Sequence, residues 1–329
     1  MKIYSAIQPT GAIHLGNYAG AIMNWVKMQD EGECIYAIAN YHSLTAIQDP
    51  KGLPKRVFDA ALDLLACGLD PQKCSLYVQS HIPEVTELTW ILSCCAPMGE
   101  LNRMTQFKEK STRTDVVNAG LFTYPVLMAS DILLFKADVV PVGEDQLQHL
   151  EVARVFARRF NSVFGETFPE PQSRLTKSAR IMALNDPTKK MSKSLEGSAI
   201  MLSDPDSVIL RHVKRAVTDA GPDNASGQMS PGVANMFTLL ETFSDQETVK
   251  YLHEQYDQGT LRYKELKDAL GKALVSAITP IRERREELAQ KPDYVKEVLY
   301  ESARKMRVIA KATLAEVREK AGLGALPDA

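Results

Sequence analysis

The 329-residue sequence has little excess of either charge, few cysteines and no long apolar run. Its 39 lysines and arginines nearly balance 41 aspartates and glutamates, for a formal net charge of −2. Because phosphate binding needs clustered lysine and arginine, this balance argues against a protein that coats nucleic acid along its whole surface. Any contact with RNA must come from local patches.

The cysteines number five, and none belongs to a C-x-x-C pair. His81, His149, His212 and His253 stand at no metal-ligand spacing from each other or from a cysteine. We therefore expect reduced thiols, with neither a disulfide framework nor a dedicated metal site.

Residues 3–26 contain no Asp, Glu, Lys or Arg, which raises the question of a signal peptide or a membrane span. Polar residues and breakers such as Gln8, Pro9, His14 and Asn17 interrupt the stretch, so no continuous apolar block forms. We reject both interpretations and expect a cytoplasmic protein with no membrane contact.

The first half of the sequence alternates strand-like and helix-like patterns. The predicted strands are 3–7, 34–39 and 75–78, and the predicted helices are 14–29, 53–66 and one that Pro83 opens. This order predicts parallel pairing with right-handed crossovers, hence an α/β fold with a doubly wound, Rossmann-type parallel sheet. Ligands bind such sheets beyond the carboxyl ends of the strands, so the loops after Ile7, Ala39 and Val142 are the places for chemistry.

From Asp204 onward the pattern is helical almost throughout. Segments 204–218, 231–245, 261–278 and 293–320 have helical periodicity, and the loop 219–232 is rich in Gly, Pro, Asp and Ser. We expect a smaller all-α domain here, with that loop exposed. The last 51 residues carry a net charge of only +2, which solvated helix faces explain as well as RNA binding does.

A first motif, residues 8–17, reads QPTGAIHLGN and joins the first strand to the first helix. Gly11 and Gly16 allow close approach of a ligand to the backbone, and the start of a helix favours phosphate. His14 and Asn17, three residues apart, place two hydrogen-bonding side chains on one face. By itself, this motif is equally compatible with a plain turn that holds a hydrogen-bonded histidine.

A second motif, residues 189–194, reads KKMSKS and follows a turn-prone Asn-Asp-Pro. The two ammonium groups and two hydroxyls of residues 190–194 can bind a polyphosphate and stabilise charge as pyrophosphate departs. A solvated basic loop is the ordinary alternative for paired lysines, but the first motif upstream argues against it.

Together the two motifs resemble the HIGH and KMSKS signatures of class I aminoacyl-tRNA synthetases. Three further runs, MTQFKEK from Met104, YPVLMASDIL from Tyr124 and VPVGEDQ from Val140, resemble bacterial-type tryptophanyl-tRNA synthetases. The resemblance covers essentially the whole chain. It implies a catalytic domain over 1–186, the KMSKS loop with a helical anticodon-binding domain over 187–292, and a C-terminal helix over 293–329 that packs back on the catalytic domain.

The resemblance also implies binding residues. ATP would contact Gln8, Pro9, Thr10, Gly16, Asn17, Gly143, Glu144, Asp145, Ile181, Lys190, Met191, Ser192, Lys193 and Ser194. Tryptophan would contact Asp131, Tyr4, His42, Met128, Val140, Val142 and Gln146, with the indole N–H on Asp131. Asp131 stands in an apolar helix, where a buried carboxylate needs a partner. An internal hydrogen bond or a phenolic O–H could satisfy it equally well, so it does not by itself distinguish tryptophan from tyrosine.

We expect ATP-dependent activation of L-tryptophan and its transfer to tRNA(Trp). Lys110, Lys190 and Lys193 would neutralise the leaving pyrophosphate, while His14 and Asn17 would steady the ATP phosphates. Mg²⁺ would arrive with ATP, since no carboxylate cage is visible. The resemblance further implies a homodimer. The alternatives are a tyrosine–tRNA ligase and a noncatalytic nucleotide-binding relative.

The sequence departs from the family pattern at several positions. Tyr4 stands where Phe is usual, and Asn40-Tyr41 precedes His42 where Asp-Gln is common. His14, often Thr in this family, agrees with the wider class. These differences concern the details of the pocket, and the expected reaction is unaffected.

Overall fold

The computed structural model describes residues 1–45, 49–111, 117–143, 146–175, 181–193, 197–218 and 229–324, without the side chains of 109–111. Within these ranges, one sheet of five strands has the order β3-β2-β1-β4-β5, and every neighbouring pair is parallel. The strands are β1 (Lys2–Ile7), β2 (Glu33–Ile38), β3 (Cys74–Val78), β4 (Val139–Val142) and β5 (Gln172–Leu175). The predicted fold class is confirmed. The chain adds β2 and β3 on one side of β1 and then β4 and β5 on the other side. The strand order therefore reverses between β1 and β4, which is where such folds open a crevice.

Alternate side chains of the strands enter two separate hydrophobic cores, as a sheet covered on both faces requires. On one face, residues such as Ile3 and Leu76 pack with the helices that follow β1 and β2. On the other, Tyr4 and Tyr77 pack with helices of the middle of the chain. The elements around the sheet are α1 (Leu15–Asn17), η1 (Tyr18–Ile22), α2 (Met23–Met28), α3 (Asn40–Ser43), α4 (Leu53–Ala66), η2 (Gln79–His81), α5 (Glu84–Cys95), α6 (Met98–Arg103), α7 (Thr105–Ser111), α8 (Ala119–Leu133) and α9 (Leu147–Phe164).

The predicted helix over 14–29 consists of three consecutive helical segments. α1 continues into η1, a π-helical stretch, and then into α2. A π-helical turn widens the hydrogen-bonding ring by one residue and is frequent beside functional sites. Here it begins directly after Asn17, the last residue of the first motif.

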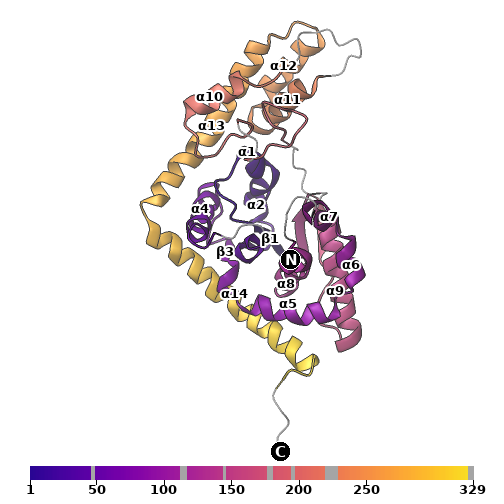
Figure 1. Ribbon diagram of the computed structural model, residues 1–329. Helices are drawn as coiled ribbons and strands as arrows, with labels where there is room; N and C mark the ends of the chain where they lie inside the picture. The colour runs from indigo at the N-terminus through magenta and orange to yellow at the C-terminus, as the bar shows by residue number, and fades with distance from the viewer. Residues whose placement is uncertain are drawn as a thin grey trace, which may run out of the picture.

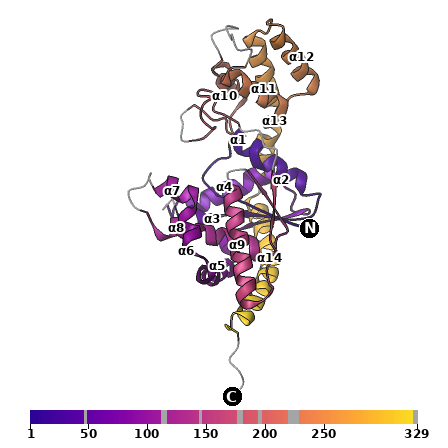
Figure 2. The same cartoon turned by 90° about the vertical axis from the view of Figure 1, so that its right-hand side faces the viewer.

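The helices between Asp206 and Ala289 form an all-helical region, most of which lies above the sheet in Figures 1 and 2. It contains α10 (Asp206–Lys214), α11 (Pro231–Phe243), α12 (Gln246–Asp257) and α13 (Tyr263–Ala289). The predicted helix 261–278 was too short, because α13 continues through Pro280, where Arg282 pairs with Asp206. Residues 231 and 232 of the predicted loop already belong to α11, and 219–228 lie outside the described residues.

The last helix, α14 (Pro292–Lys320), lies along β3 and α5 in both views (Figures 1 and 2). The Leu76 backbone N–H donates to Ser302 Oγ at 3.3 Å, and Arg307 pairs with the buried Glu84 at 2.8 Å. The edge strand β3 is therefore covered by a helix from the far end of the sequence, which protects it from pairing with another chain.

The end of α13 is also tied to the region around the sheet. Arg285 pairs with the buried carboxylate of Asp63 on α4, and the other oxygen of that carboxylate accepts the Ile13 backbone N–H at 3.2 Å. Among the described residues, no helix is both long enough and apolar enough to cross a bilayer.

Candidate active site

The first motif forms a tight, self-bonded entrance to helix α1. His14 Nδ1 accepts the Asn17 backbone N–H at 3.3 Å, and Asn17 Oδ1 accepts the His14 backbone N–H at 3.4 Å. This reciprocal pair satisfies helix-end donors as a capping box does. Because Nδ1 is the acceptor, the proton of the neutral ring lies on Nε2, which can donate to a ligand.

Two glycines allow this geometry. Gly11 has a φ of +112°, a region that L side chains rarely adopt. A Cβ on Gly16 would stand 3.0 Å from His14 Cε1, so the histidine ring lies directly over this glycine. The spacing of the motif is therefore a steric requirement of the turn.

The backbone around the second motif packs against the first. The Leu15 N–H donates to the Ile200 carbonyl at 2.8 Å, and the Leu202 N–H donates to the Ile13 carbonyl at 3.0 Å. Lys193 Nζ lies 3.7 Å from the position that a Cβ on Gly11 would take. Motifs separated by some 170 residues of sequence thus meet at one place.

The electrostatics of this meeting point keep His14 neutral. Burial, followed by the charges of Lys193 and then Lys190, lowers the pKa of His14 to about 4. Burial also lowers the pKa of Lys193, and the carboxylate of Asp63 opposes that shift. At pH 7 the site therefore combines an uncharged imidazole donor with ammonium groups, an arrangement suited to an anionic ligand.

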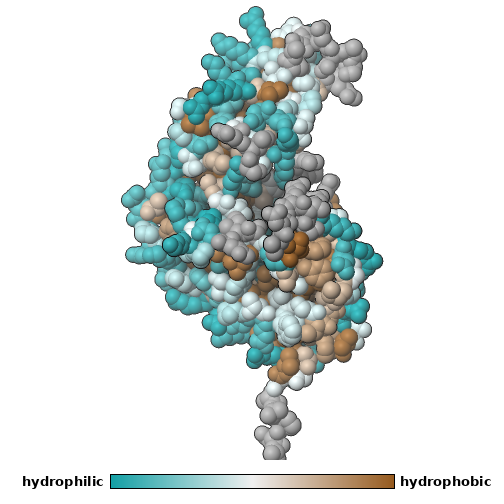
Figure 3. All heavy atoms as spheres, viewed as in Figure 1, coloured by the Kyte–Doolittle hydropathy of each residue, from teal (hydrophilic) through white to brown (hydrophobic). Residues whose placement is uncertain are grey.

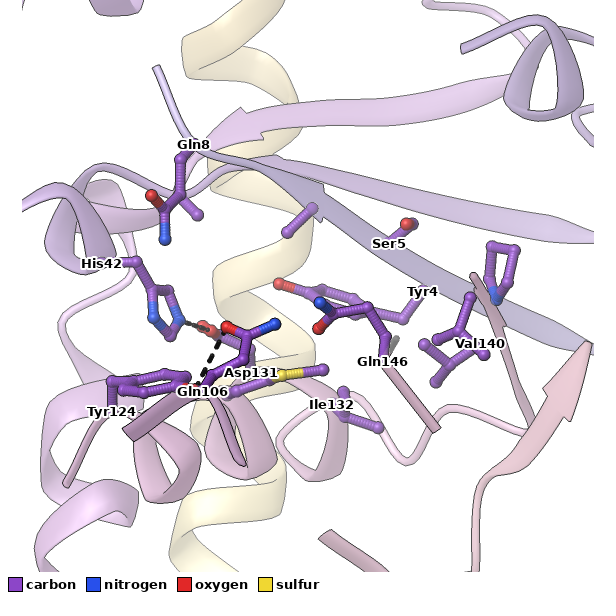
Figure 4. Close-up of a pocket in the computed structure, with 15 residues that line it drawn as sticks. Tyr4, Ser5, Gln8, His42, Gln106, Tyr124, Asp131, Ile132, Val140 and Gln146 are labelled. Atoms are coloured by element: carbon purple, nitrogen blue, oxygen red, sulfur yellow. Dashed lines mark hydrogen bonds and ion pairs between the residues drawn. The ribbon is translucent and has the colours of Figure 1, made fainter. Parts of the chain in front are cut away.

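A cavity of about 240 Å³ opens beside the first motif, at the carboxyl ends of β1, β2 and β4 (Figure 4). It lies at the predicted loops, where the sheet order reverses. Its lining is mainly apolar with a few polar groups: Tyr4, Ser5, Ala6, Gln8, Ala39, His42, Gln106, Tyr124, Met128, Asp131, Ile132, Val140, Pro141, Val142 and Gln146. Such a lining suits an aromatic ligand that needs a small number of oriented hydrogen bonds.

The polar centre of the cavity is the carboxylate of Asp131, on α8 and only 2% exposed. His42 Nε2 lies 2.8 Å from Oδ2, and Gln79 Nε2 donates to Oδ1 at 2.8 Å and to Oδ2 at 2.9 Å. A buried carboxylate needs such partners. Nearby, burial and then the Asp131 charge raise the pKa of Tyr4 well above its ordinary range.

All seven residues predicted to bind tryptophan line this one cavity. Of the predicted ATP residues, Gln8 lines it too, and Pro9 to Asn17 form the adjacent turn. Ile181 is buried and its carbonyl accepts the Met191 N–H at 3.1 Å, while Gly143 accepts from the Gln146 N–H at 3.0 Å. Glu144, Asp145 and Ser194 lie outside the described residues, as does the side chain of Lys110.

Several residues of the site were not predicted. The Tyr124 hydroxyl lies 2.6 Å from His149 Nε2 and donates to Gln106 Oε1 at 3.4 Å. Burial raises the pKa of this phenol to about 12. Gln106 and Tyr124 stand in the family-like runs that begin at Met104 and Tyr124, so that signal was available. No signal in the sequence pointed to Gln79, because its contact with Asp131 joins residues that are 52 positions apart.

Comparisons with known proteins agree with this geometry. Residues 1–279 match the family model of tRNA synthetases class I (W and Y). The tryptophan–tRNA ligase of Wolinella succinogenes is 45% identical over 329 residues, covering 98% of each chain. The chain belongs to the tryptophan–tRNA ligase family of class I tRNA synthetases.

Solved structures lead to the same family. The Campylobacter jejuni tryptophanyl-tRNA synthetase, complexed with ADP and tryptophan, superposes with a TM-score of 0.86 at 36% identity, covering 98% of this chain and 100% of that one. The Mycoplasma pneumoniae enzyme gives a TM-score of 0.86 at 35% identity, with 98% coverage of both chains. The predicted resemblance is confirmed.

The low pKa of His14 makes the stability of this synthetase depend on pH. An unfolded histidine has a pKa of about 6.5, whereas that of folded His14 is about 4. Between these values the unfolded chain binds more protons, so the free energy of unfolding falls as pH drops. His14→Gln should flatten that fall in urea unfolding at pH 7 and pH 4.5. His212→Gln, on α10, is the matched control. A His14→Gln variant with the native pH dependence would contradict the assignment.

Proposed function

We propose that the chain activates L-tryptophan with ATP, forming tryptophanyl-adenylate and pyrophosphate, and then transfers tryptophan to tRNA(Trp). One observation carries the proposal: the cavity around Asp131 adjoins the first motif at the carboxyl end of β1, and the second motif, which bears the lysines, packs against the first. Gln8 belongs to both, since it starts the first motif and lines the cavity. The carboxylate of tryptophan in the cavity and the α-phosphate of ATP at the motifs would meet at this junction.

The first step requires no general base. The carboxylate of tryptophan is ionised at pH 7. One of its oxygens forms a bond to the α-phosphorus of ATP, and the bond to the bridging oxygen of pyrophosphate breaks. The protein therefore contributes positioning and charge stabilisation.

We assign the charge stabilisation to the two motifs. Lys190 and Lys193, with Lys110, would neutralise the departing pyrophosphate. His14 would donate from Nε2, and Asn17 would hold His14 in place through their reciprocal hydrogen bonds. ATP would arrive as its Mg²⁺ complex, because Mg²⁺ commonly binds through substrate phosphates.

Specificity for tryptophan would come from Asp131. A carboxylate has about four acceptor positions, and three contacts from Gln79 and His42 already use most of them. An indole N–H would complete the set inside a shaped apolar slot. A substrate without that N–H leaves a buried acceptor unpaired, which can discriminate by about 10⁴-fold or more.

We also propose that residues 1–186 act as the catalytic domain, 187–292 as the KMSKS loop with an anticodon-binding domain, and 293–329 as a returning helix. A groove between α10 and α13 supports the RNA role, because it is lined by Lys214, Lys264, Lys267 and Lys272 with Asp268 as its single acid. Clustered lysines of this kind suit a phosphate backbone. The five free thiols favour a reducing, cytoplasmic location.

A homodimer is supported by an apolar face on the catalytic half. Brown residues gather in the lower right of Figure 3, where Figure 1 draws α6 and α8. Trp90 on α5 is 71% exposed, Met98 on α6 is 62% exposed, and Leu44 after α3 is 51% exposed. Leu44 also lines an apolar hollow, together with Thr86, Thr89 and Leu127. Exposed apolar surface of this kind marks an interface.

The function is tested by amino-acid-dependent ATP–pyrophosphate exchange. With labelled pyrophosphate, tryptophan should support exchange and tyrosine should not. Exchange with tyrosine alone would indicate a tyrosine–tRNA ligase. Absence of exchange with every amino acid would indicate a noncatalytic nucleotide-binding protein and would overturn the proposal.

Lys193→Ala should slow adenylate formation by about 100-fold or more, because it removes charge stabilisation at the leaving group. Tryptophan affinity should change little, since Lys193 does not line the cavity. Single-turnover kinetics and equilibrium titration separate the two effects. Lys189→Ala is the matched control, because Lys189 is 64% exposed and pairs with Asp186. Equal losses of rate and affinity would refute the role.

Trp90→Glu should shift the protein toward monomers, because it replaces an exposed aromatic side chain of the proposed interface by a charge. Analytical ultracentrifugation over a range of concentrations measures the shift. Val308→Glu on α14, where the valine is 70% exposed, is the control and should leave the assembly unchanged. If Trp90→Glu sediments as the native protein does, the interface lies elsewhere.

A further inference from the structure

Gln79 occupies a buried position behind the tryptophan cavity. It begins η2 directly after β3, and its exposed fraction is 1%. It is not among the residues that line the cavity. Its side-chain amide nevertheless bonds at both ends, so its role has to be sought in the residues that it holds.

The nitrogen end of the amide faces Asp131. Gln79 Nε2 reaches both carboxylate oxygens, at 2.8 Å and 2.9 Å. This bifurcated contact fixes the rotation of the carboxyl group about its own axis, which a single hydrogen bond would not do. It leaves Asp131 as an oriented acceptor for a ligand in the cavity.

The oxygen end of the amide faces α3, the short helix that carries His42. Gln79 Oε1 accepts the Tyr41 backbone N–H at 2.9 Å. The neighbouring residues reinforce the link, since Asn40 Nδ2 donates to Ser80 Oγ at 2.8 Å and the Ser80 N–H donates to Asn40 Oδ1 at 3.0 Å. Three hydrogen bonds therefore fasten α3 to η2.

The two ends of Gln79 converge on one acceptor. His42, on the fastened turn, lies 2.8 Å from Asp131 Oδ2. Gln79 thus sets Asp131 directly through its nitrogen and indirectly through the backbone beside His42. Opposite ends of an amide are a donor and an acceptor, so no apolar residue and no carboxylate can make both contacts.

We propose that Gln79 is a positioning residue for substrate selection, which orients Asp131 so that one acceptor direction points at the indole N–H of tryptophan. This inference rests on the proposed function. Its effect is confined to the recognition of a ring N–H. The chemistry at the phosphate and the binding of ATP do not depend on Gln79.

The test compares two substrates in two variants. Gln79→Met keeps the length of the side chain and removes both hydrogen-bonding ends. Gln29→Met is the matched control, because Gln29 is also buried and bridges two backbone groups, the Gly68 carbonyl and the Asp70 N–H, away from the cavity. The substrates are L-tryptophan and its benzothiophene isostere, L-3-(3-benzothienyl)alanine, which carries sulfur in place of the ring N–H.

In Gln79→Met, the KM for tryptophan should rise by roughly tenfold or more, as expected for a weakened hydrogen bond to a charged group. The KM for the isostere, the KM for ATP and kcat should each stay within about twofold, so the preference for tryptophan should fall by the same roughly tenfold factor. Gln29→Met should keep the native preference. A destabilising effect alone would not change the ratio of the two substrates.

Two outcomes would overturn the inference: a native preference in folded Gln79→Met, or an equal loss for both substrates. If that variant does not fold, Gln79→Leu serves instead, because it also removes both hydrogen-bonding ends and has a smaller side chain. It should lose tryptophan binding by roughly tenfold or more in equilibrium titration, and native binding would overturn the inference. Failure of the proposed function is separate, since the native protein would then show no tryptophan-dependent exchange.

Discussion

The switch in strand order between β1 and β4 is the constraint on which the site depends. Neighbouring parallel strands normally place their connecting helices against each other and fill the space at their carboxyl ends. Where the order reverses, the helices diverge, and the carboxyl ends of the two strands stay open to a ligand. The turn at His14 follows β1, and the cavity around Asp131 is lined by residues of β1 and β4 together with residues of α8.

The second constraint is backbone pairing between distant segments. The hydrogen bonds that join Leu15 to Ile200 and Leu202 to Ile13 fix the segment that follows the second motif beside the first motif. Side-chain charge alone could not do this, because two lysines and a histidine repel rather than attract when protonated. The backbone holds them together, and burial, followed by the charges of the two lysines, lowers the pKa of His14.

Much of the fold could be predicted from the sequence, because its signals are local. The strands at 3–7, 34–39 and 75–78 and the helix 53–66 follow from short periodic patterns, and their observed bounds differ by at most one residue. The continuation of α13 beyond 278 could not be predicted, since it depends on ion pairs of Arg282 and Arg285 with Asp206 and Asp63. The cavity residues were predicted by family resemblance, whereas Gln79 requires coordinates, because its bond to Asp131 joins two elements with no shared pattern.

The uncharged state of His14 has a consequence for turnover. A cluster of permanent cations would hold the triphosphate strongly, but it would hold the released diphosphate fragment just as strongly and delay its escape. An imidazole whose pKa is about 4 offers a directed N–H without adding a further positive charge. His14 can therefore bind the nucleotide through a directed hydrogen bond without adding to the positive charge from which the leaving pyrophosphate must escape.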